Sequence, residues 1–91
     1  MDVFEYYFPV TSYVEFNLDL DKVYKYIKCK YPDMDDDEIY NEFGDNMKLY
    51  ILELGDMTEE KKKQFQEAYG PEYDSMLDDI WADFEVYLGE K

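Results

Sequence analysis

Apolar and polar positions near the N-terminus alternate as they do in strands. The segments Val3–Phe8 and Ser12–Leu18 are rich in aromatic and β-branched residues, and the second alternates around Glu15 and Asn17. Runs of this kind, separated by only a few residues, predict two strands joined by a short connection. We therefore expect the chain to begin with a β-hairpin.

The spacing becomes helical after the hairpin. Asp19 suits an N-cap, and Pro32 marks the end of the first predicted helix. A second helix is predicted with Asp33 as a possible N-cap and Gly44 as its stop. Its apolar stripe should face the core and leave its carboxylates in solvent. The apolar residues of the two helices are Leu20, Val23, Tyr24, Ile27 and Tyr31, then Ile39, Tyr40 and Phe43.

Three further elements follow. The run Met47–Leu54 predicts a third strand, and Thr58 predicts the cap of a helix that extends to Tyr69. A last helix should start at Glu72, with an inward stripe at spacings of four and three that consists of Tyr73, Leu77, Ile80, Phe84 and Tyr87. The order predicts an α+β domain spanning residues 1–91. We expect a small antiparallel sheet (the N-terminal hairpin plus one later strand) packed against about four short helices.

The charge of the chain restricts its partners. The net charge is −15, with nine lysines and neither arginine nor histidine. Direct binding of nucleic acid is therefore not expected, whereas binding of a basic protein is. The apolar content of 46%, with 20% aromatic residues, is too high for a disordered acidic tail. We expect a folded monomer or small homo-oligomer.

Cysteine usage and hydropathy indicate a cytoplasmic protein without cofactors. Cys29 is the single cysteine, so an internal disulfide and a multi-cysteine zinc site are both excluded. The first residues carry acids where a secretory signal would carry lysines. No apolar run approaches the roughly 20 residues that cross a bilayer, and an anionic membrane surface would repel this charge.

The acidic residues are concentrated between residues 31 and 60, which hold eleven acids against Lys48. The stretch YPDMDDDEIYNEF lies there. Aligned with a calcium-binding loop, it has Glu38 where glycine is required and Gly44 where glutamate is required. The pattern is not that of an EF-hand and leaves only weak, nonspecific binding of divalent ions. Asp35 to Glu38 instead crowd the first turn of a helix, where the helix dipole favours negative charge.

No residue pattern predicts catalysis. Ser12 and Ser75 have no histidine to activate them, and Cys29 has no general base beyond its neighbouring lysines. The four glycines form no phosphate-binding loop. We expect that the protein is not an enzyme.

The acidic faces are therefore the candidate site. In the last helix Glu72, Asp79, Asp83 and Glu90 recur at spacings of seven, four and seven, with Asp74, Asp78 and Glu85 beside them. Nearby tyrosines could supply aromatic anchors. An acidic surface that only keeps the protein soluble is the alternative interpretation. The candidate partner-binding residues are Asp35, Asp36, Asp37, Glu38, Glu42, Asp45, Glu72, Tyr73, Asp79, Asp83 and Tyr87.

In its small size, its abundance of tyrosine and acid, and stripes such as EYDSMLDDIWADFE, the chain resembles phage-encoded DNA-mimic inhibitors. That class includes anti-CRISPR proteins, anti-restriction proteins and the uracil-DNA glycosylase inhibitor. The resemblance implies an inhibitor that occupies the basic nucleic-acid channel of a host defence enzyme, with carboxylates in place of phosphates. Two alternatives are an acidic immunity or antitoxin-like protein that neutralises a basic toxin, and a generic acidic interaction module.

Overall fold

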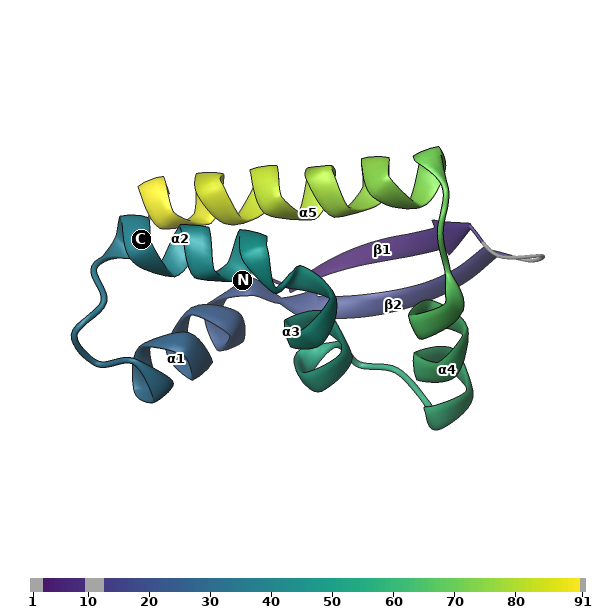
Figure 1. Ribbon diagram of the computed structural model, residues 1–91, viewed down its shortest axis with the longest axis horizontal. Coiled ribbons are helices and arrows are strands. Elements are labelled where there is room, and N and C mark those ends of the chain that lie inside the picture. Colours follow the sequence, from purple (N-terminus) through teal and green to yellow (C-terminus); the bar gives the residue numbers. More distant parts are fainter. Residues whose placement is uncertain (1–2, 10–12, 91) are drawn as a thin grey trace.

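The computed structural model describes residues 3–9 and 13–90. Its elements follow one another along the chain in the order strand, strand and five helices (Figure 1). They are β1 (Val3–Pro9), β2 (Tyr13–Asp19), α1 (Leu20–Lys30), α2 (Asp36–Asp45), α3 (Met47–Leu54), α4 (Glu59–Glu67) and α5 (Pro71–Glu90). The predicted α+β class is confirmed.

The predicted hairpin is confirmed too. β1 and β2 pair antiparallel, with Tyr6 opposite Phe16 and Glu5 opposite Asn17. Tyr6, Phe16 and Leu18 are buried on one face, and Glu5, Tyr7, Glu15 and Asn17 are exposed. Alternation with a period of two thus gives the hairpin one face in the core and one in solvent. The predicted connection, Val10–Ser12, lies outside the described residues.

Side-chain caps fix the starts of α1 and α2. The Asp19 carboxylate accepts hydrogen bonds from the backbone N–H groups of Asp21 and Lys22, as predicted. The predicted cap of α2 at Asp33 is wrong, because Asp35 caps that helix and forms a capping box with Glu38. The box satisfies two backbone donors reciprocally, which Asp33 cannot do from two residues upstream. Pro32 follows the end of α1 at Lys30, as predicted.

The predicted third strand is wrong, because Met47–Leu54 forms helix α3. Among the described residues the sheet has two strands. The buried residues of α3 fall at i, i+3, i+4 and i+7: Met47, Tyr50, Ile51 and Leu54. This is the pattern of a helix with one face in the core.

Helices α4 and α5 are separated by a turn at Gly70, whose φ of 116° lies in the left-handed region that favours glycine. Thr58 caps α4, as predicted, but the helix ends at Glu67, before Tyr69. α5 has 20 residues and is therefore about 30 Å long. It lies along the hairpin and α2 (Figure 1) and contacts β1, α2 and α1.

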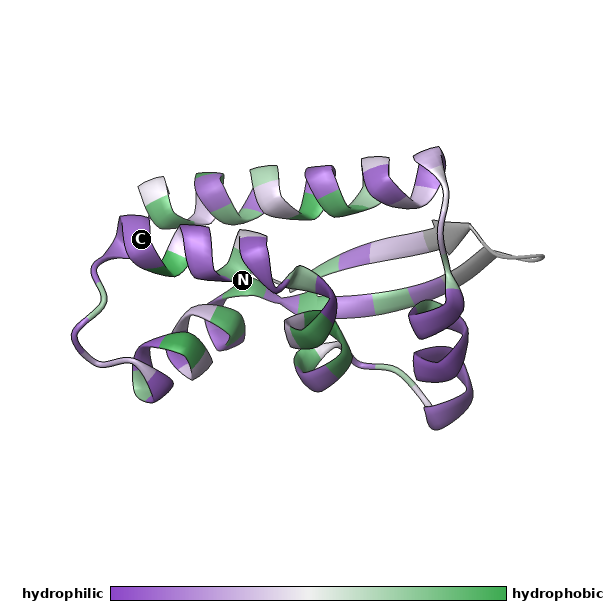
Figure 2. Cartoon of the chain, in the orientation of Figure 1, coloured by the Kyte–Doolittle hydropathy of each residue, from purple (hydrophilic) through white to green (hydrophobic). Residues whose placement is uncertain are grey.

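One hydrophobic cluster joins the hairpin to the five helices. Figure 2 shows the apolar residues of α5 on the side that faces α2 and the hairpin, whereas α4 is strongly hydrophilic. Helices of 8 to 11 residues are marginal alone in water, so α1 to α4 depend on this packing. The side chains that are fully buried are Phe16, Phe43, Phe65, Phe84, Leu18, Leu20, Ile27, Ile39, Ile51, Ile80 and Val23.

Candidate functional site

Tyrosine hydroxyls bind several of the candidate carboxylates and join distant elements through them. Among pairs of described residues, a single ion pair forms, between Lys25 and Asp21 at 2.8 Å. The chain has no arginine to bind these carboxylates, and tyrosine hydroxyls donate the hydrogen bonds that join them to other elements. The four pairs between elements are Tyr6–Asp83 (2.8 Å), Tyr50–Glu42 (2.5 Å), Tyr24–Asp36 (3.1 Å) and Tyr87–Asp21 (2.5 Å).

Two of these pairs raise the pKa of the phenol group that donates the hydrogen bond. Burial, followed by the hydrogen bond to Asp83, raises the pKa of Tyr6 well above its ordinary value of 10. Burial and the bond to Glu42 do the same to the pKa of Tyr50. Hydrogen bonds from Lys25 and then Tyr87 lower the pKa of Asp21. Asp36, Glu42 and Asp83 therefore have structural roles as well as negative charge.

Tyr73 and Tyr87 lie on the inward stripe of α5, as its spacing predicts, and not on the acidic surface, where they were expected as anchors. Tyr73 is 4% exposed and Tyr87 is 7% exposed, and both belong to the core. The Tyr73 hydroxyl is buried and has no hydrogen-bond partner among the described residues. Burial, with a smaller effect of Asp74, raises the pKa of Tyr73 to about 12. Neither ring can serve as an aromatic anchor, because each fills the inward stripe of the helix.

The carboxylates of the stretch between residues 33 and 45 differ in exposure. Asp35, Asp37 and Glu38 are exposed, as predicted. Asp36 and Glu42 are half-buried, so the prediction that they lie largely in solvent is wrong. The apolar stripe turns inward as expected, with Ile39 and Phe43 fully buried and Tyr40 half-buried.

The acids of α5 lie on two sides of the helix. Asp83 and Asp79 face β1. Asp83 binds the Tyr6 hydroxyl, and the charge of Asp79 contributes to the rise in the pKa of Tyr6. Asp74, Asp78 and Glu85 instead line hollows that they share with residues of α2. Asp79 and Asp83 therefore share one side of the helix, as predicted, and the acids expected beside them lie against α2 instead. Glu72 and Glu90 are exposed at the two ends of the helix.

An aromatic stack joins α2 to α5. The Tyr40 and Trp81 rings are parallel within 8°, with centroids 4.5 Å apart, and Trp81 Nε1 donates to the Tyr40 carbonyl at 3.0 Å. Gly44 lets the indole approach, because a Cβ there would lie 2.6 Å from the Trp81 ring. Gly44 thus does not stop α2, which continues to Asp45. It permits a close contact between the two helices.

Six carboxylates surround this stack, and we call them the acidic seam. Asp45, Asp74 and Asp78 line a hollow that contains Trp81. Asp36, Asp37 and Glu85 line a second hollow that contains Tyr40. Among the described residues that line the two hollows, Lys48 is the one cation, and its ammonium lies 5.6 Å from the Tyr73 ring centroid.

The charge density of the acidic seam is close to that of one nucleic-acid strand. The α5 residues that line the two hollows run from Asp74 to Gly89, and over this interval the helix axis rises about 22 Å at 1.5 Å per residue. Six carboxylates along that length give one charge per roughly 4 Å, compared with about 3.4 Å per phosphate along one strand of duplex DNA. The α2 carboxylates lie beside this same interval, since they share the two hollows.

Three of the eleven predicted contact residues belong to the acidic seam: Asp36, Asp37 and Asp45. The sequence placed Asp74, Asp78 and Glu85 next to the predicted stripe without including them. The rings of Tyr40 and Trp81 are also absent from the predicted candidate site. The sequence does contain a pattern that indicates this side of α5, because residues 74, 78, 81 and 85 recur at helical spacings of four, three and four.

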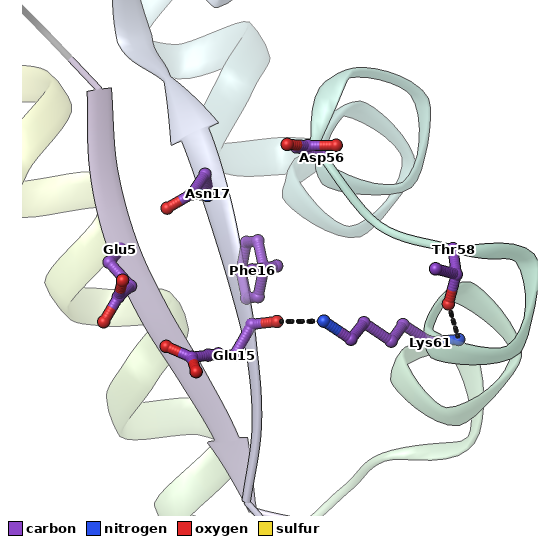
Figure 3. Close-up of a pocket in the computed structure, with 7 residues that line it drawn as sticks. All are labelled: Glu5, Glu15, Phe16, Asn17, Asp56, Thr58 and Lys61. Carbon is purple, nitrogen blue, oxygen red and sulfur yellow. Dashed lines mark hydrogen bonds between the residues drawn. The ribbon is translucent and has the colours of Figure 1, made fainter.

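A further acidic hollow lies beside the outer edge of β2 (Figure 3). Glu5 and Glu15 project from the same face of the hairpin, and Asp56 lies across the hollow. The Lys61 ammonium donates to the Glu15 carbonyl at 3.1 Å, and the Asp56 N–H donates to the Asn17 carbonyl at 2.8 Å. These donors satisfy backbone acceptors at a strand edge, which otherwise invites pairing with other chains.

Within residues 3–9 and 13–90, no group of three or more acidic or cysteine side chains is arranged to hold a metal ion. Cys29 is an exposed free thiol. None of the described helices combines the length and hydropathy needed to span a membrane. Comparison with protein-family models, curated proteins and solved structures finds no match to this chain.

Proposed function

We propose that the protein is an inhibitor that binds the basic nucleic-acid-binding surface of a bacterial defence enzyme, of the CRISPR or restriction type. The acidic seam is the contact surface, and its carboxylates take the place of phosphates. The observation that supports this proposal is the array of six carboxylates from two helices, in hollows where Lys48 is the one cation within residues 3–9 and 13–90.

The array is preorganised. The Tyr40–Trp81 stack and its hydrogen bond hold α2 against α5, so the carboxylates of both helices keep their spacing without a partner. Side chains on a rigid scaffold lose less entropy on binding than those of a flexible acidic peptide. The strong negative field also speeds the encounter with a basic channel. Competition with nucleic acid needs neither catalysis nor a cofactor, and we place it in the host cytoplasm.

The proposal is tested with a panel of purified CRISPR effector and restriction enzymes. Each enzyme is mixed with fluorescently labelled target DNA, and the protein is titrated into the mixture. We expect it to displace DNA from at least one enzyme, with a strong loss of affinity as salt rises, because exposed charges are screened beyond a Debye length. Displacement from none of the enzymes would contradict the proposal. Tight, salt-independent binding to a single basic toxin would support an immunity protein instead.

A further inference from the structure

Three tyrosines surround a hollow on a different part of the molecule. Tyr26 and Tyr31 come from α1 and its C-terminal end, and Tyr50 comes from α3. The hollow has a volume of about 420 Å³, within the range of roughly 300–1,000 Å³ of small-molecule sites. It shares no residue with the acidic seam. The other lining residues are Lys30, Glu42, Asn46, Leu49 and Glu53.

The rings form walls that meet at an angle. Tyr26 and Tyr50 lie edge to face, with centroids 6.0 Å apart and an interplanar angle of 77°. Tyr50 is 4% exposed and belongs to the core, so it lines the floor of the hollow, and its hydroxyl donates to Glu42 at 2.5 Å; the accessible walls are the half-buried Tyr26 and Tyr31. A cation over the face of an aromatic ring is attracted by the negative charge of that face, and carboxylates beside the ring add to the attraction.

A cation of the chain already lies over these rings. The Lys30 ammonium is 5.6 Å from the Tyr31 ring centroid and 5.8 Å from that of Tyr50. Both distances are near the limit of about 6 Å for a cation–π contact. Lys30 is exposed and is the last residue of α1. A cation can therefore come within reach of the Tyr31 and Tyr50 rings, and the exposed side chain of Lys30 can leave this position.

The hollow also combines negative charge with apolar surface. Glu42 and Glu53 supply two carboxylates, and Leu49 supplies an apolar side chain that is 67% exposed. A hydrated metal ion gains little from aromatic rings. A quaternary alkylammonium or a guanidinium group matches both features, because its charge is diffuse and more weakly hydrated than that of a primary ammonium.

We propose that this hollow, an aromatic cage lined by Tyr26, Tyr31 and Tyr50, binds an organic cation. The cation is a quaternary alkylammonium or guanidinium group, and it displaces the Lys30 ammonium from over the rings. A free quaternary ammonium compound and the side chain of a basic protein carry the same chemistry. The inference rests on the geometry of the cage alone and does not depend on the acidic seam or on the proposed inhibition.

The test compares choline with its neutral isostere 3,3-dimethylbutan-1-ol, at constant ionic strength, by NMR titration of the tyrosine ring signals. We expect saturable shifts at Tyr26 and Tyr31 with choline and at least tenfold weaker binding of the alcohol. Equal affinity for the two probes would overturn the proposal, since the cage would then recognise shape without charge. N-acetyl-lysine methylamide and N-acetyl-arginine methylamide, titrated in parallel, distinguish a protein side chain from a free small cation.

Two substitutions and a control localise the site. Lys30→Met should raise the affinity for choline severalfold, because it removes the competing ammonium. Tyr31→Leu should lower it by at least fivefold, whereas Tyr69→Leu, at a tyrosine that is 87% exposed elsewhere, should have no effect. Weaker binding in Lys30→Met, or unchanged binding in folded Tyr31→Leu, would overturn the proposal. The comparison of the two probes on the unmodified protein stands even where a variant fails to fold.

Discussion

Asp83 and Asp79 provide a matched comparison of a structural and a solvated carboxylate. They lie four residues apart on the β1-facing side of α5. Asp83 accepts a hydrogen bond from the buried Tyr6 hydroxyl at 2.8 Å, whereas Asp79 is exposed. Either replacement by alanine removes one negative charge from a protein of net charge −15. Both replacements also give the same gain in intrinsic helix propensity. Any difference in stability therefore measures the contact with Tyr6.

The size of the effect follows from this contact. A hydrogen bond to a charged group contributes about 1.5–3 kcal/mol, and a buried hydroxyl left without a partner costs a similar amount. Asp83 is half-exposed, so water and salt screen part of this contribution to stability. Loss of one negative charge also relieves some of the repulsion between the acidic residues. We expect Asp83→Ala to lose about 1–2 kcal/mol of the free energy of unfolding. This corresponds to a fall of roughly 5–15 °C in Tm for a domain of this size.

Urea unfolding monitored by circular dichroism, on both alanine variants and on Tyr6→Phe, gives the required free energies. Asp79→Ala should change the free energy of unfolding by less than about 0.5 kcal/mol, with a slight gain. The double mutant Tyr6→Phe, Asp83→Ala should show a coupling energy of about 1 kcal/mol. A coupling energy of zero, or an equal cost for Asp79→Ala, would refute the assignment of a structural role to Asp83.

Two further predictions concern the packing of α2 on α5 and the partnerless hydroxyl of the core. Gly44→Ala should cost about 1–3 kcal/mol and shift the Trp81 fluorescence to the red, because its Cβ would collide with the indole. Gly89→Ala, where nothing lies within 4 Å, should stabilise by about 0.5–1 kcal/mol, and an equal effect of both substitutions would contradict the packing. Tyr73→Phe should keep or raise stability at pH 7 by up to about 1 kcal/mol, since the hydroxyl has no partner among the described residues. The pKa of Tyr73 is about 12 in the folded protein and about 10 in the unfolded chain. The stabilising contribution of this group is therefore complete below about pH 10 and falls by about 1.4 kcal/mol per pH unit between about pH 10 and pH 12. Tyr73→Phe should flatten this decline in alkaline unfolding curves.

The elements that the sequence predicted correctly had one unambiguous period or cap. The hairpin alternates with a period of two, and Asp19 and Thr58 cap helices as expected. Met47–Leu54 was misassigned because six of its eight residues are apolar or aromatic, so it matches both a buried strand and a helix. Length did not decide the matter, since an eight-residue segment suits either element.

The candidate site was predicted only in part, because partners distant in sequence decide the role of each carboxylate. Asp83 and Glu42 look like free surface acids until the fold brings Tyr6 and Tyr50 to them. Tyr73 and Tyr87 looked like anchors within an acidic stripe, yet they continue the inward stripe of α5. The acidic seam depends on the packing of α2 against α5, which helical spacing alone does not define.

The proposal that the acidic seam binds a basic partner is tested most directly by two charge-reversal variants of equal charge. One carries Asp37→Lys, Asp78→Lys and Glu85→Lys within the seam, and the other carries Glu15→Lys, Glu60→Lys and Glu67→Lys outside it. All six residues are exposed, and circular dichroism confirms folding before the DNA-displacement assay. We predict at least a hundredfold loss of inhibition for the seam variant and less than a tenfold loss for the outside variant. Equal losses would mean that net charge alone drives binding, and a seam variant that inhibits as well as the parent would contradict the assignment of the contact surface.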